Sequence, residues 1–289
     1  MKALTRKIVR FAKSIPLLLR SIKMVYRHGG YSTVHIANVH CGEILKGKNV
    51  LITGGSRGIG LSIAKKCIQE GAQTVITGRS TDALERAKGE INSPLLKTLA
   101  WDVSQIPQME AGLAKAGNLF GGDIDVLVNN AGIANGVAFP DVTENIWDEM
   151  YATNSKGLFF LTQAVCGKWM ARKNDRIRKV INISSQGGFV GATYPYRLTK
   201  WDVAGLTQGL GIRLAPYGII VNGIAPGIIA TDMQPRFLQQ NENVYCALNP
   251  LKRVALPDEI ASLAIFLMSD AANFIVGQTI VCDGGFSLK

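Results

Sequence analysis

The sequence predicts an α/β fold in which one doubly wound parallel sheet of about seven strands carries helices on both faces. Short apolar runs recur along the chain after residue 47, and segments with helical spacing separate them. This alternation is the pattern of right-handed crossovers between parallel strands. The chain has 289 residues, of which 47% are hydrophobic and only 18% are charged, so one core of ordinary size can be buried without a second domain.

The first 42 residues differ from the rest and are predicted to form a basic amphipathic extension and a connector. They contain eight Lys or Arg and no acid, whereas residues 43–289 hold 24 basic and 21 acidic residues. Helical spacing puts the apolar residues on one side, and the basic residues occupy the rest of the wheel; the apolar set is Leu4, Ile8, Phe11, Ile15, Leu18, Ile22 and Val25. The longest uncharged apolar stretch, 14–19, is too short to cross a bilayer.

Three roles are open for residues 1–27. They could lie on anionic lipid as an interfacial helix, act as an organelle presequence that is removed, or pack on their own subunit or a neighbour. Residues 43–289 are expected to be a cytoplasmic domain, with peripheral membrane contact through the extension as one option. Nucleic acid is not expected as a partner, because the basic excess lies in the extension and no arginine–aromatic stripe or helix-turn-helix pattern follows.

The first strand and the turn after it predict a dinucleotide-binding, Rossmann-like site. Residues 48–53 are an apolar strand, a glycine-rich turn follows, and residues 61–70 have helical spacing. Glycines let the backbone approach phosphate closely, and the N–H groups and positive dipole of the following helix bind its charge. The expected contacts in this turn are Gly54, Ser56, Arg57, Gly58, Ile59 and Gly60.

The second strand, residues 73–80, indicates which cofactor is bound. An acidic residue at the end of such a strand holds the two ribose hydroxyls of NAD, but Thr77 and Gly78 stand there instead. Arg79 just beyond them, together with Arg57, could clamp a 2′-phosphate through charge-assisted hydrogen bonds. The sequence therefore favours NADP(H) over NAD(H), although either arginine alone could be an ordinary solvated charge.

Five further strands complete the predicted sheet. They are expected at residues 95–100, 125–132, 179–185, 219–225 and 278–282. After the third strand, the Asp102 carboxylate beside Val103 could accept a hydrogen bond from an adenine amino group. The fourth strand ends in Asn129 and Asn130, whose amides can brace neighbouring strand ends and leave room for the cofactor.

Tyr196 and Lys200 indicate the chemistry. At positions i and i+4 they fall on one face of a helix, so the ammonium can lie beside the phenol and favour its ionised form. The phenol then becomes a usable proton donor and acceptor near neutrality. All three histidines precede the glycine turn, and the five cysteines form no CxxC or CxxH pair, so histidine triads and a metal site are not expected. The cysteines are expected to be buried thiols in a reducing compartment.

Together these motifs resemble the short-chain dehydrogenase/reductase family from about Glu43 to the C-terminus. The matching motifs are Thr53-Gly54-x-x-x-Gly58-Ile59-Gly60, Asn129-Asn130-Ala131-Gly132, Asn154, Ser185, Tyr196-x-x-x-Lys200, Pro226-Gly227 with Thr231, and Asp283-Gly284-Gly285. Their order is specific for the family, and the motifs are nearest to those of 3-oxoacyl-[acyl-carrier-protein] reductases. They do not name a substrate, because the family reduces sugars, acyl thioesters, steroids and xenobiotic ketones on one scaffold.

The resemblance implies a role for each catalytic residue. Tyr196 would give its proton to a carbonyl oxygen as hydride arrives, and Lys200 would lower the pKa of Tyr196 and hold the nicotinamide ribose. Ser185 would hydrogen-bond the carbonyl oxygen and the developing alkoxide, and Asn154 would hold a water that links Lys200 to solvent. Further cofactor contacts are implied for Asn130, Ala131, Gly132, Pro226, Gly227, Ile229 and Thr231.

The substrate side is implied by the same resemblance. Residues 232–249 fall where the family has its mobile substrate lid. The expected wall favours an apolar or amphipathic ketone, although such side chains also fill ordinary cores; it comprises Phe139, Trp147, Gln186, Phe189, Tyr194 and Met233.

Two positions depart from the family's pattern. Arg197 replaces a small polar residue, and Trp201 follows Lys200 where small residues are usual. The family's four-helix dimer interface is built on this helix, so the bulk of Trp201 is at odds with the usual packing. A homotetramer is the family default, and a homodimer is the other assembly considered.

The leading interpretation is an NADPH-dependent oxidoreductase that reduces a carbonyl to a secondary alcohol, with a substrate linked to a carrier protein or CoA as a 3-oxoacyl thioester. The second is a reductase or dehydrogenase of a sugar, polyol or lipophilic ketone. The third is a cofactor-binding sensor without turnover. The complete set of Asn154, Ser185, Tyr196 and Lys200 argues against a sensor, which would not need all four.

Overall fold

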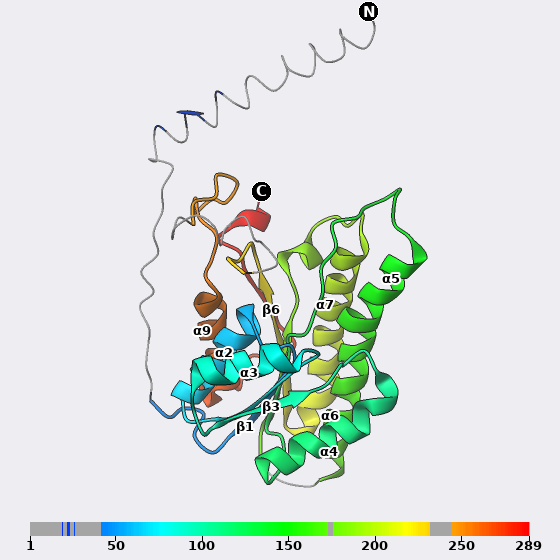
Figure 1. The fold of residues 1–289 in the computed structure, drawn as a ribbon. Coiled ribbons are helices and arrows are strands. Elements are labelled where there is room, and N and C mark those ends of the chain that lie inside the picture. Colours follow the sequence, from blue (N-terminus) through cyan, green and yellow to red (C-terminus); the bar gives the residue numbers. More distant parts are fainter. Residues whose placement is uncertain are drawn as a thin grey trace, which may run out of the picture.

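The computed structural model describes residues 19, 22, 23, 26, 42–172, 176–231 and 244–288. Its centre is one sheet of seven parallel strands in the order β3-β2-β1-β4-β5-β6-β7 (Figure 1). The strands are β1 Asn49–Ile52, β2 Gln73–Gly78, β3 Leu96–Ala100, β4 Val126–Asn129, β5 Arg178–Ile183, β6 Ile219–Pro226 and β7 Thr279–Cys282. The strand order reverses between β1 and β4, which opens a crevice at the carboxyl ends of these strands. The predicted doubly wound α/β fold is confirmed.

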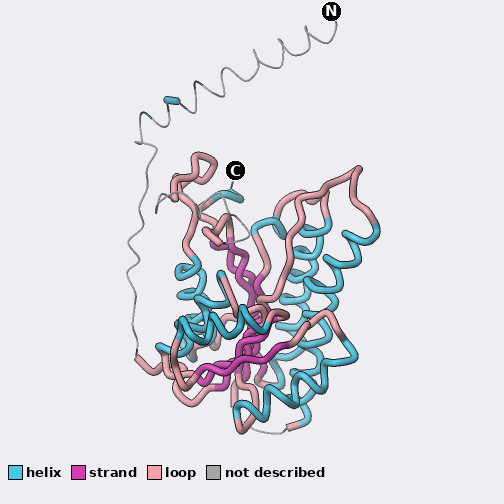
Figure 2. Tube along the Cα trace, in the orientation of Figure 1, coloured by secondary structure: helices cyan, strands magenta, loops and turns pink. Residues whose placement is uncertain are grey.

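Helices cover both faces of the sheet, as Figure 2 shows. They are α2 Gly58–Gln69, α3 Thr81–Ile91, α4 Met109–Phe120, α5 Glu144–Tyr151, α6 Leu158–Ala171, α7 Pro195–Leu214 and α9 Pro257–Met268. Side chains of α2, α3 and α9 share one hydrophobic core with the sheet. Side chains of α4, α6 and α7 share a second core with the opposite face.

Successive side chains of a strand point to opposite cores. In β1, Val50 and Ile52 belong to the core under α2 and α9, whereas Leu51 belongs to the core under α4 and α6. All three side chains are completely buried. A strand buried on both faces is an unbroken apolar run, which is why the sequence predicts it without alternation.

The predicted fourth strand, 125–132, is longer than β4. The strand ends at Asn129 because the next two residues leave the sheet. The backbone N–H groups of Asn130 and Ala131 both donate to the Thr53 hydroxyl, each at 3.0 Å. The end of β4 is thereby tied to the end of β1, at the crevice.

The predicted lid, residues 232–249, is only partly described. Residues 232–243 lie outside the described part of the chain, but the remainder is packed. The backbone N–H of Val254 donates to the Val244 carbonyl at 2.8 Å, and Val244, Cys246 and Val254 form a small buried cluster. Val244, Cys246 and Asn249 are buried, whereas Leu248 is exposed, and the mobile lid stays a prediction.

The N-terminal extension lies almost entirely outside the described residues. Of residues 1–41, the structure describes only positions 19, 22, 23 and 26, which are helical. The amphipathic extension and its three roles therefore stay predictions. In the described part of the chain, no helix is long and apolar enough to span a bilayer. The same described residues bring together no group of three His, Cys, Asp or Glu that could hold a metal.

Candidate active site

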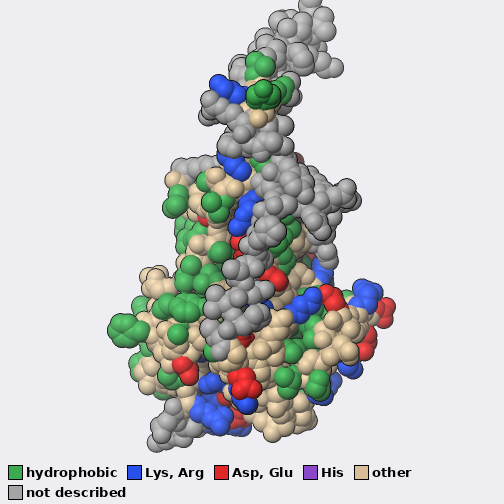
Figure 3. Space-filling view, turned by 90° about the vertical axis from the view of Figure 1, so that its left-hand side faces the viewer, with side chains coloured by type: hydrophobic (Ala, Val, Ile, Leu, Met, Phe, Trp, Pro, Cys, Tyr) green, Lys and Arg blue, Asp and Glu red, His purple; other side chains and the backbone are tan. Residues whose placement is uncertain are grey.

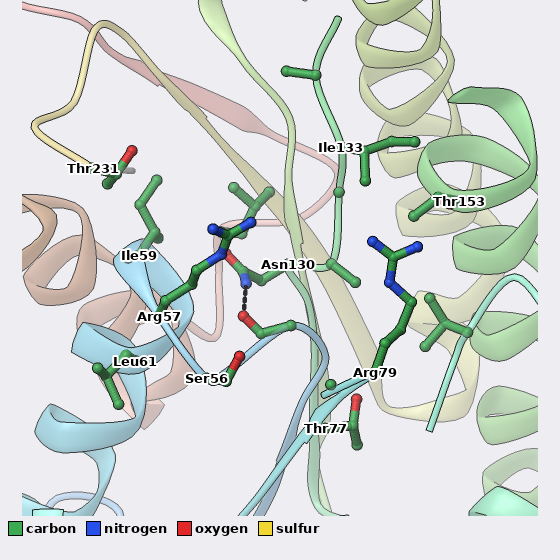
Figure 4. Close-up of a pocket in the computed structure, with 18 of the residues that line it drawn as sticks. Ser56, Arg57, Ile59, Leu61, Thr77, Arg79, Asn130, Ile133, Thr153 and Thr231 are labelled. Carbon is green, nitrogen blue, oxygen red and sulfur yellow. Dashed lines mark hydrogen bonds between the residues drawn. The ribbon is translucent and has the colours of Figure 1, made fainter. Parts of the chain in front are cut away.

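A cavity of about 840 Å³ lies at the carboxyl ends of the strands. Residues from the turn after β1, the ends of β2, β3 and β4, the end of β5, α7 and the end of β6 line it (Figure 4). The predicted residues on its wall are Gly54, Ser56, Arg57, Gly58, Ile59, Arg79, Asp102, Val103, Asn130, Ala131, Gly132, Ser185, Tyr196, Lys200, Pro226, Gly227, Ile229 and Thr231. The tertiary structure therefore brings nearly all of the predicted site residues together in one space.

The glycine turn is shaped for close approach. Gly54 and Gly58 have φ values of +64° and +55°, in the left-handed region that glycine tolerates best. A side chain at Gly54 is excluded in any case, because its Cβ would lie 2.8 Å from the Cα of Ala131. The turn leads directly into the N-terminus of α2, whose first N–H groups have no intrahelical partner and suit a phosphate.

Gly60 packs against the end of β4. A Cβ at Gly60 would lie 2.4 Å from the Asn130 amide nitrogen and 2.5 Å from the Gly54 carbonyl oxygen. The Asn130 amide donates to the carbonyls of Thr53 (3.0 Å) and Gly54 (2.9 Å). Gly60 is therefore needed for the packing of the turn against Asn130, and its predicted cofactor contact stays a prediction.

The predicted bracing of strand ends by amides is confirmed. The Asn129 amide, at the end of β4, donates to the Asn182 side-chain oxygen of β5 at 2.9 Å and to the Thr162 hydroxyl of α6 at 2.8 Å. Asn182 in turn donates to the Thr207 hydroxyl of α7 at 2.9 Å. These buried hydrogen bonds join two strands and two helices directly beneath the cavity, so its floor is held rigidly.

Exposed arginine side chains line the cavity. Arg57 extends from the glycine turn and Arg79 follows β2, and both lie on the cavity wall in Figure 4. No carboxylate is present at the end of β2, where Thr77 is buried and Gly78 has no side chain. Arg86 of α3 also lines the cavity, and sequence reasoning missed it because nothing in a helical arginine distinguishes it from surface charge.

Asp102 lines the cavity after β3, as predicted for an adenine contact. One oxygen of its carboxylate accepts hydrogen bonds from the Ser104 backbone N–H (3.0 Å) and hydroxyl (2.8 Å). These bonds hold the carboxylate in place. The adenine contact itself stays a prediction.

Tyr196, Ser185 and Lys200 meet where the cavity reaches α7. The phenol of Tyr196 is hydrogen-bonded to Ser185, whose own hydroxyl accepts from the Gly187 N–H at 3.1 Å. The Lys200 ammonium donates to the Ile183 carbonyl at 2.9 Å and lies 5.6 Å from the centroid of the Tyr196 ring. The predicted side-by-side arrangement on one helix face is therefore present.

The pKa of Tyr196 changes in the direction opposite to the prediction. Burial raises its pKa, and this outweighs the hydrogen bond from Ser185, which lowers it. Lys200 lies over the ring and donates to a backbone carbonyl, and burial lowers the pKa of Lys200 itself to about 8. In the protein alone, the phenol is therefore held in its protonated form at neutral pH.

Asn154 lies in a π-helical segment, Ala152–Gly157, between α5 and α6. Its amide is bound by protein partners: the oxygen accepts from the Ile133 N–H at 2.9 Å, and the nitrogen donates to the Ile133 carbonyl at 2.9 Å and to the Thr199 hydroxyl at 3.2 Å. The extra residue of a π-turn redirects side chains, and such turns are frequent at functional sites. Asn154 anchors the segment after β4, and its water-holding role stays a prediction.

The predicted substrate residues lie beside the cavity and not on its wall. The ring of Tyr194 is stacked on that of Tyr196, with centroids 6.4 Å apart and planes 12° apart. Gln186 and Phe189 lie in the short 3-10 segment after Ser185. Phe139, 82% exposed, is joined to this region by a hydrogen bond from its N–H to the Thr193 carbonyl at 2.8 Å.

Two further residues were predicted on the substrate side, Trp147 and Met233. Trp147 lies on α5 and stacks on Tyr151, with ring centroids 4.8 Å apart. Met233 lies outside the described residues. Gln186, Phe189 and Tyr194 lie on the segments next to Ser185 and Tyr196, and the substrate wall stays a prediction.

Comparison with known proteins identifies the family. A family model described as Enoyl-(Acyl carrier protein) reductase matches residues 54–287. Gluconate 5-dehydrogenase of Gluconobacter oxydans is 34% identical over 249 residues, which cover 85% of this chain and 96% of that protein. The 3-oxoacyl-[acyl-carrier-protein] reductase FabG of Aquifex aeolicus is 35% identical over 246 residues, which cover 83% of this chain and 98% of that protein.

Among solved structures, 3-ketoacyl-(acyl-carrier-protein) reductase from Brucella melitensis, complexed with NADH, is 30% identical with a TM-score of 0.78, covering 84% of this chain and 99% of that one. The chain belongs to the short-chain dehydrogenase/reductase family. It is an oxidoreductase that acts on CH–OH and C=O groups with a nicotinamide cofactor. The glycine turn at the N-terminus of α2 and the cavity beside Tyr196 fit such a cofactor.

Proposed function

We propose that the protein reduces a carbonyl to a secondary alcohol with NADPH, and that its substrates are 3-oxoacyl thioesters. The observation that carries the cofactor preference is the pair Arg57 and Arg79 on the cavity wall, together with the absence of a carboxylate at the end of β2. A 2′-phosphate between two guanidinium groups gains charge-assisted hydrogen bonds that an unphosphorylated ribose cannot make.

The residues around Tyr196 suit proton donation to a carbonyl oxygen. When bound, the cofactor supplies the hydride. Tyr196 is protonated at neutral pH because burial raises its pKa, so it can give its proton to the oxygen that gains charge. Ser185, hydrogen-bonded to the phenol, can donate to the same oxygen and stabilise its charge. Lys200, with a pKa of about 8, is mostly protonated at pH 7 and can support the loss of the Tyr196 proton.

The thioester substrate is supported by apolar side chains next to the reacting groups. Phe139, Phe189 and Tyr194 lie on segments adjoining Ser185 and Tyr196. An acyl chain suits such a surface better than a sugar acid does. The FabG relative acts on this substrate class by its name, whereas the Gluconobacter relative supports the alternative of a sugar-acid or polyol substrate.

The face of the molecule seen in Figure 3 gives no argument for a carrier protein. On the face seen in Figure 3, basic and acidic side chains are interspersed where the described residues are visible. The proposal therefore rests on the active site and not on a basic docking patch. A CoA thioester is an equally suitable form of the substrate.

The cofactor preference is tested by titrating the purified chain with NADPH and NADH. NADPH is expected to bind more tightly, and Arg57→Met with Arg79→Met is expected to weaken NADPH by about 100-fold while leaving NADH nearly unchanged. Lys88→Met, an exposed residue of α3 paired with Glu85, is the matched control. Equal losses for both cofactors, or tighter binding of NADH, would contradict the proposal.

The substrate class is tested by following NADPH oxidation at 340 nm. Acetoacetyl-CoA is compared with 5-ketogluconate and with simple ketones of similar size. Turnover of the thioester at the highest kcat/KM supports the proposal. Turnover of the sugar acid alone moves the assignment to the alternative, and no turnover of any carbonyl rejects both.

Assembly and location are further proposals. We propose that the protein is cytoplasmic and that it forms a homotetramer or homodimer. The assembly is supported by large apolar side chains that are exposed on α6 and α7, namely Phe159, Met170, Trp201 and Ile212. Such side chains are usually covered in oligomers. The molar mass in solution, measured by light scattering, tests this directly.

A further inference from the structure

Two residues of α7 that depart from the family's pattern contact the same loop. The Arg197 guanidinium donates to the Gly191 carbonyl at 2.9 Å, and the Trp201 indole N–H donates to the Val190 carbonyl at 3.0 Å. The two donors are four residues apart and so project from one face of the helix. They bind consecutive carbonyls and hold residues 190–191 on α7.

This loop is the continuation of the segment that carries Ser185. The Ser185 hydroxyl accepts from the Gly187 N–H at 3.1 Å, and the Ser185 carbonyl accepts from the Gly188 N–H at 2.9 Å. The hydroxyl of Ser185 is therefore oriented by the short 3-10 segment Gln186–Phe189, which ends immediately before the residues held by Arg197 and Trp201.

Arg197 also contacts a neighbour of Ser185, Gly187, and a neighbour of Tyr196, Tyr194. Its aliphatic stem fills the space over Gly187, where a Cβ would lie 2.9 Å from the Arg197 Cγ. Its guanidinium carbon lies 5.2 Å from the centroid of the Tyr194 ring, and that ring is stacked on Tyr196. A cation over an aromatic face is a favourable contact, and it fixes the ring it covers.

We propose that Arg197 and Trp201 are positioning residues that clamp the Ser185 segment onto α7 and so keep Ser185 within hydrogen-bond reach of Tyr196. This inference rests on the proposed carbonyl reduction. Neither residue lines the cofactor cavity, so they act through Gly187, the 190–191 carbonyls and Tyr194. The large side chains of Arg197 and Trp201 thus support the geometry of the active site.

The test removes the two hydrogen bonds to the 190–191 carbonyls separately and keeps most of each side chain. Arg197→Met keeps the stem and removes the guanidinium, and Trp201→Phe keeps a ring and removes the N–H donor. Arg213→Met, an exposed arginine in the last turn of the same helix, is the matched control. For each variant, kcat, KM and the dissociation constant of NADPH are measured, with the primary isotope effect on kcat from 4-deuterated NADPH.

The double variant is expected to lower kcat by about tenfold for thioester and neutral ketone alike, because a small misplacement of a catalytic pair is costly. The NADPH dissociation constant is expected to change by less than about twofold, since the glycine turn is untouched. The isotope effect is expected to rise as hydride transfer becomes limiting. A merely structural role would lower the folded fraction without changing the isotope effect.

Three outcomes would overturn the inference. They are an unchanged kcat in the double variant, a loss confined to the KM of carboxylated substrates, which would make Arg197 an anion-recognition residue, and an isotope effect equal to that of the unaltered chain. If the unaltered chain reduces no carbonyl, the proposed function fails separately. Hydrogen exchange at the amides of Gly187 and Gly188 still tests the clamp: faster exchange in the double variant than in Arg213→Met supports it, and equal exchange contradicts it.

Discussion

We call the side of the sheet where the strands begin the amino edge and the side where they end the carboxyl edge. Each of them buries a lysine, and the two lysines have different surroundings. Lys200 faces the carboxyl edge and is 5% exposed, and Lys179 lies at the amino edge and is 3% exposed. Burial lowers the pKa of both to about 8. The residue type, the exposed fraction and the pKa therefore do not distinguish the two lysines.

Their surroundings tell them apart. The Lys179 ammonium donates to the carbonyls of Leu267 and Ser269 at the C-terminus of α9, where the helix dipole favours a cation. Beside it, Arg178 pairs with Asp125 at 2.5 Å and donates to the Ile124 carbonyl at 2.6 Å. At this edge the charged groups have protein partners, and their effect is to hold strands and helices together.

Lys200 has the Ile183 carbonyl as its hydrogen-bond acceptor and otherwise lies on the cavity wall beside Tyr196. An ammonium has three donors, so capacity is left for a ligand or for proton transfer. The Lys200 ammonium thus keeps donors that face a cavity, which suits the catalytic role predicted for it, whereas the Lys179 ammonium is bound by two protein carbonyls.

The largest effect is expected at the carboxyl edge. Tyr196→Phe removes the proton donor and is expected to lower kcat by about 10³-fold with little change in NADPH affinity or in the free energy of unfolding. Steady-state turnover, cofactor titration and denaturant unfolding measure the three quantities. Tyr217→Phe, at an exposed tyrosine, is the control. Turnover retained within tenfold would mean that another group donates the proton.

The amino edge is expected to respond in the opposite way. Asp125→Ala leaves the Arg178 charge buried without its carboxylate, and the free energy of unfolding is expected to fall by about 3 kcal/mol or more. The kcat of the folded fraction is expected to be unchanged. Glu110→Ala, which breaks an exposed pair with Lys168, is expected to cost less than about 1 kcal/mol. Similar losses for the two variants would show that the buried pair has no special weight.

A carboxylate placed at the end of β2 tests the cofactor preference. A Cβ at Gly78 would lie 3.4 Å from the Ser56 hydroxyl and 3.6 Å from Leu84, which are tolerable contacts. Gly78→Asp is therefore expected to fold, and it should shift the NADPH-to-NADH affinity ratio toward NADH by about 100-fold, because the new carboxylate repels a 2′-phosphate. Gly89→Asp, on the exposed side of α3, controls for added charge. An unchanged ratio would place the 2′-phosphate elsewhere.

The smallest effect is expected in the pH dependence of stability. Each lysine has a pKa of about 8 in the folded chain against 10.5 as its ordinary value, so between these limits the unfolded chain binds more protons. The contribution of the two lysines to the free energy of unfolding should therefore rise with pH from about 8 to about 10.5, and the buried thiols of Cys67 and Cys166, whose pKa burial raises, oppose this rise above their ordinary value of 9.0. Lys179→Met and Lys200→Met should each reduce this rise, but only Lys200→Met should lose turnover. A loss of turnover in both would erase the distinction between the two edges.

Much of the fold could be predicted because it depends on short-range patterns. An apolar strand running into glycines at the start of a helix specifies β1, the turn and α2 within a few residues. The Tyr196-x-x-x-Lys200 spacing specifies which side chains share a helix face, and the structure places both on the cavity wall. These predictions hold because each feature lies within one element or one turn.

Other features could not be predicted because they join residues far apart in the chain. The Asp125–Arg178 pair links residues 53 apart, and neither position has a distinguishing neighbour in the sequence. The predicted pKa direction of Tyr196 considered the nearby ammonium and omitted burial, which the sheet and α7 impose. The close packing of Gly60 on Asn130, 70 residues further along the chain, likewise has no signal in the sequence.

The sequence by itself determined the fold class and the glycine turn and predicted the reacting side chains, since these follow from local periodicity, glycine geometry and residue chemistry. The tertiary structure alone decided which buried charges face a cavity, how Arg197 and Trp201 clamp the Ser185 segment, and which way the pKa of Tyr196 moves. The physical reason is that burial and hydrogen-bond partners are properties of packed elements, and packing brings together residues whose separation along the chain carries no signal.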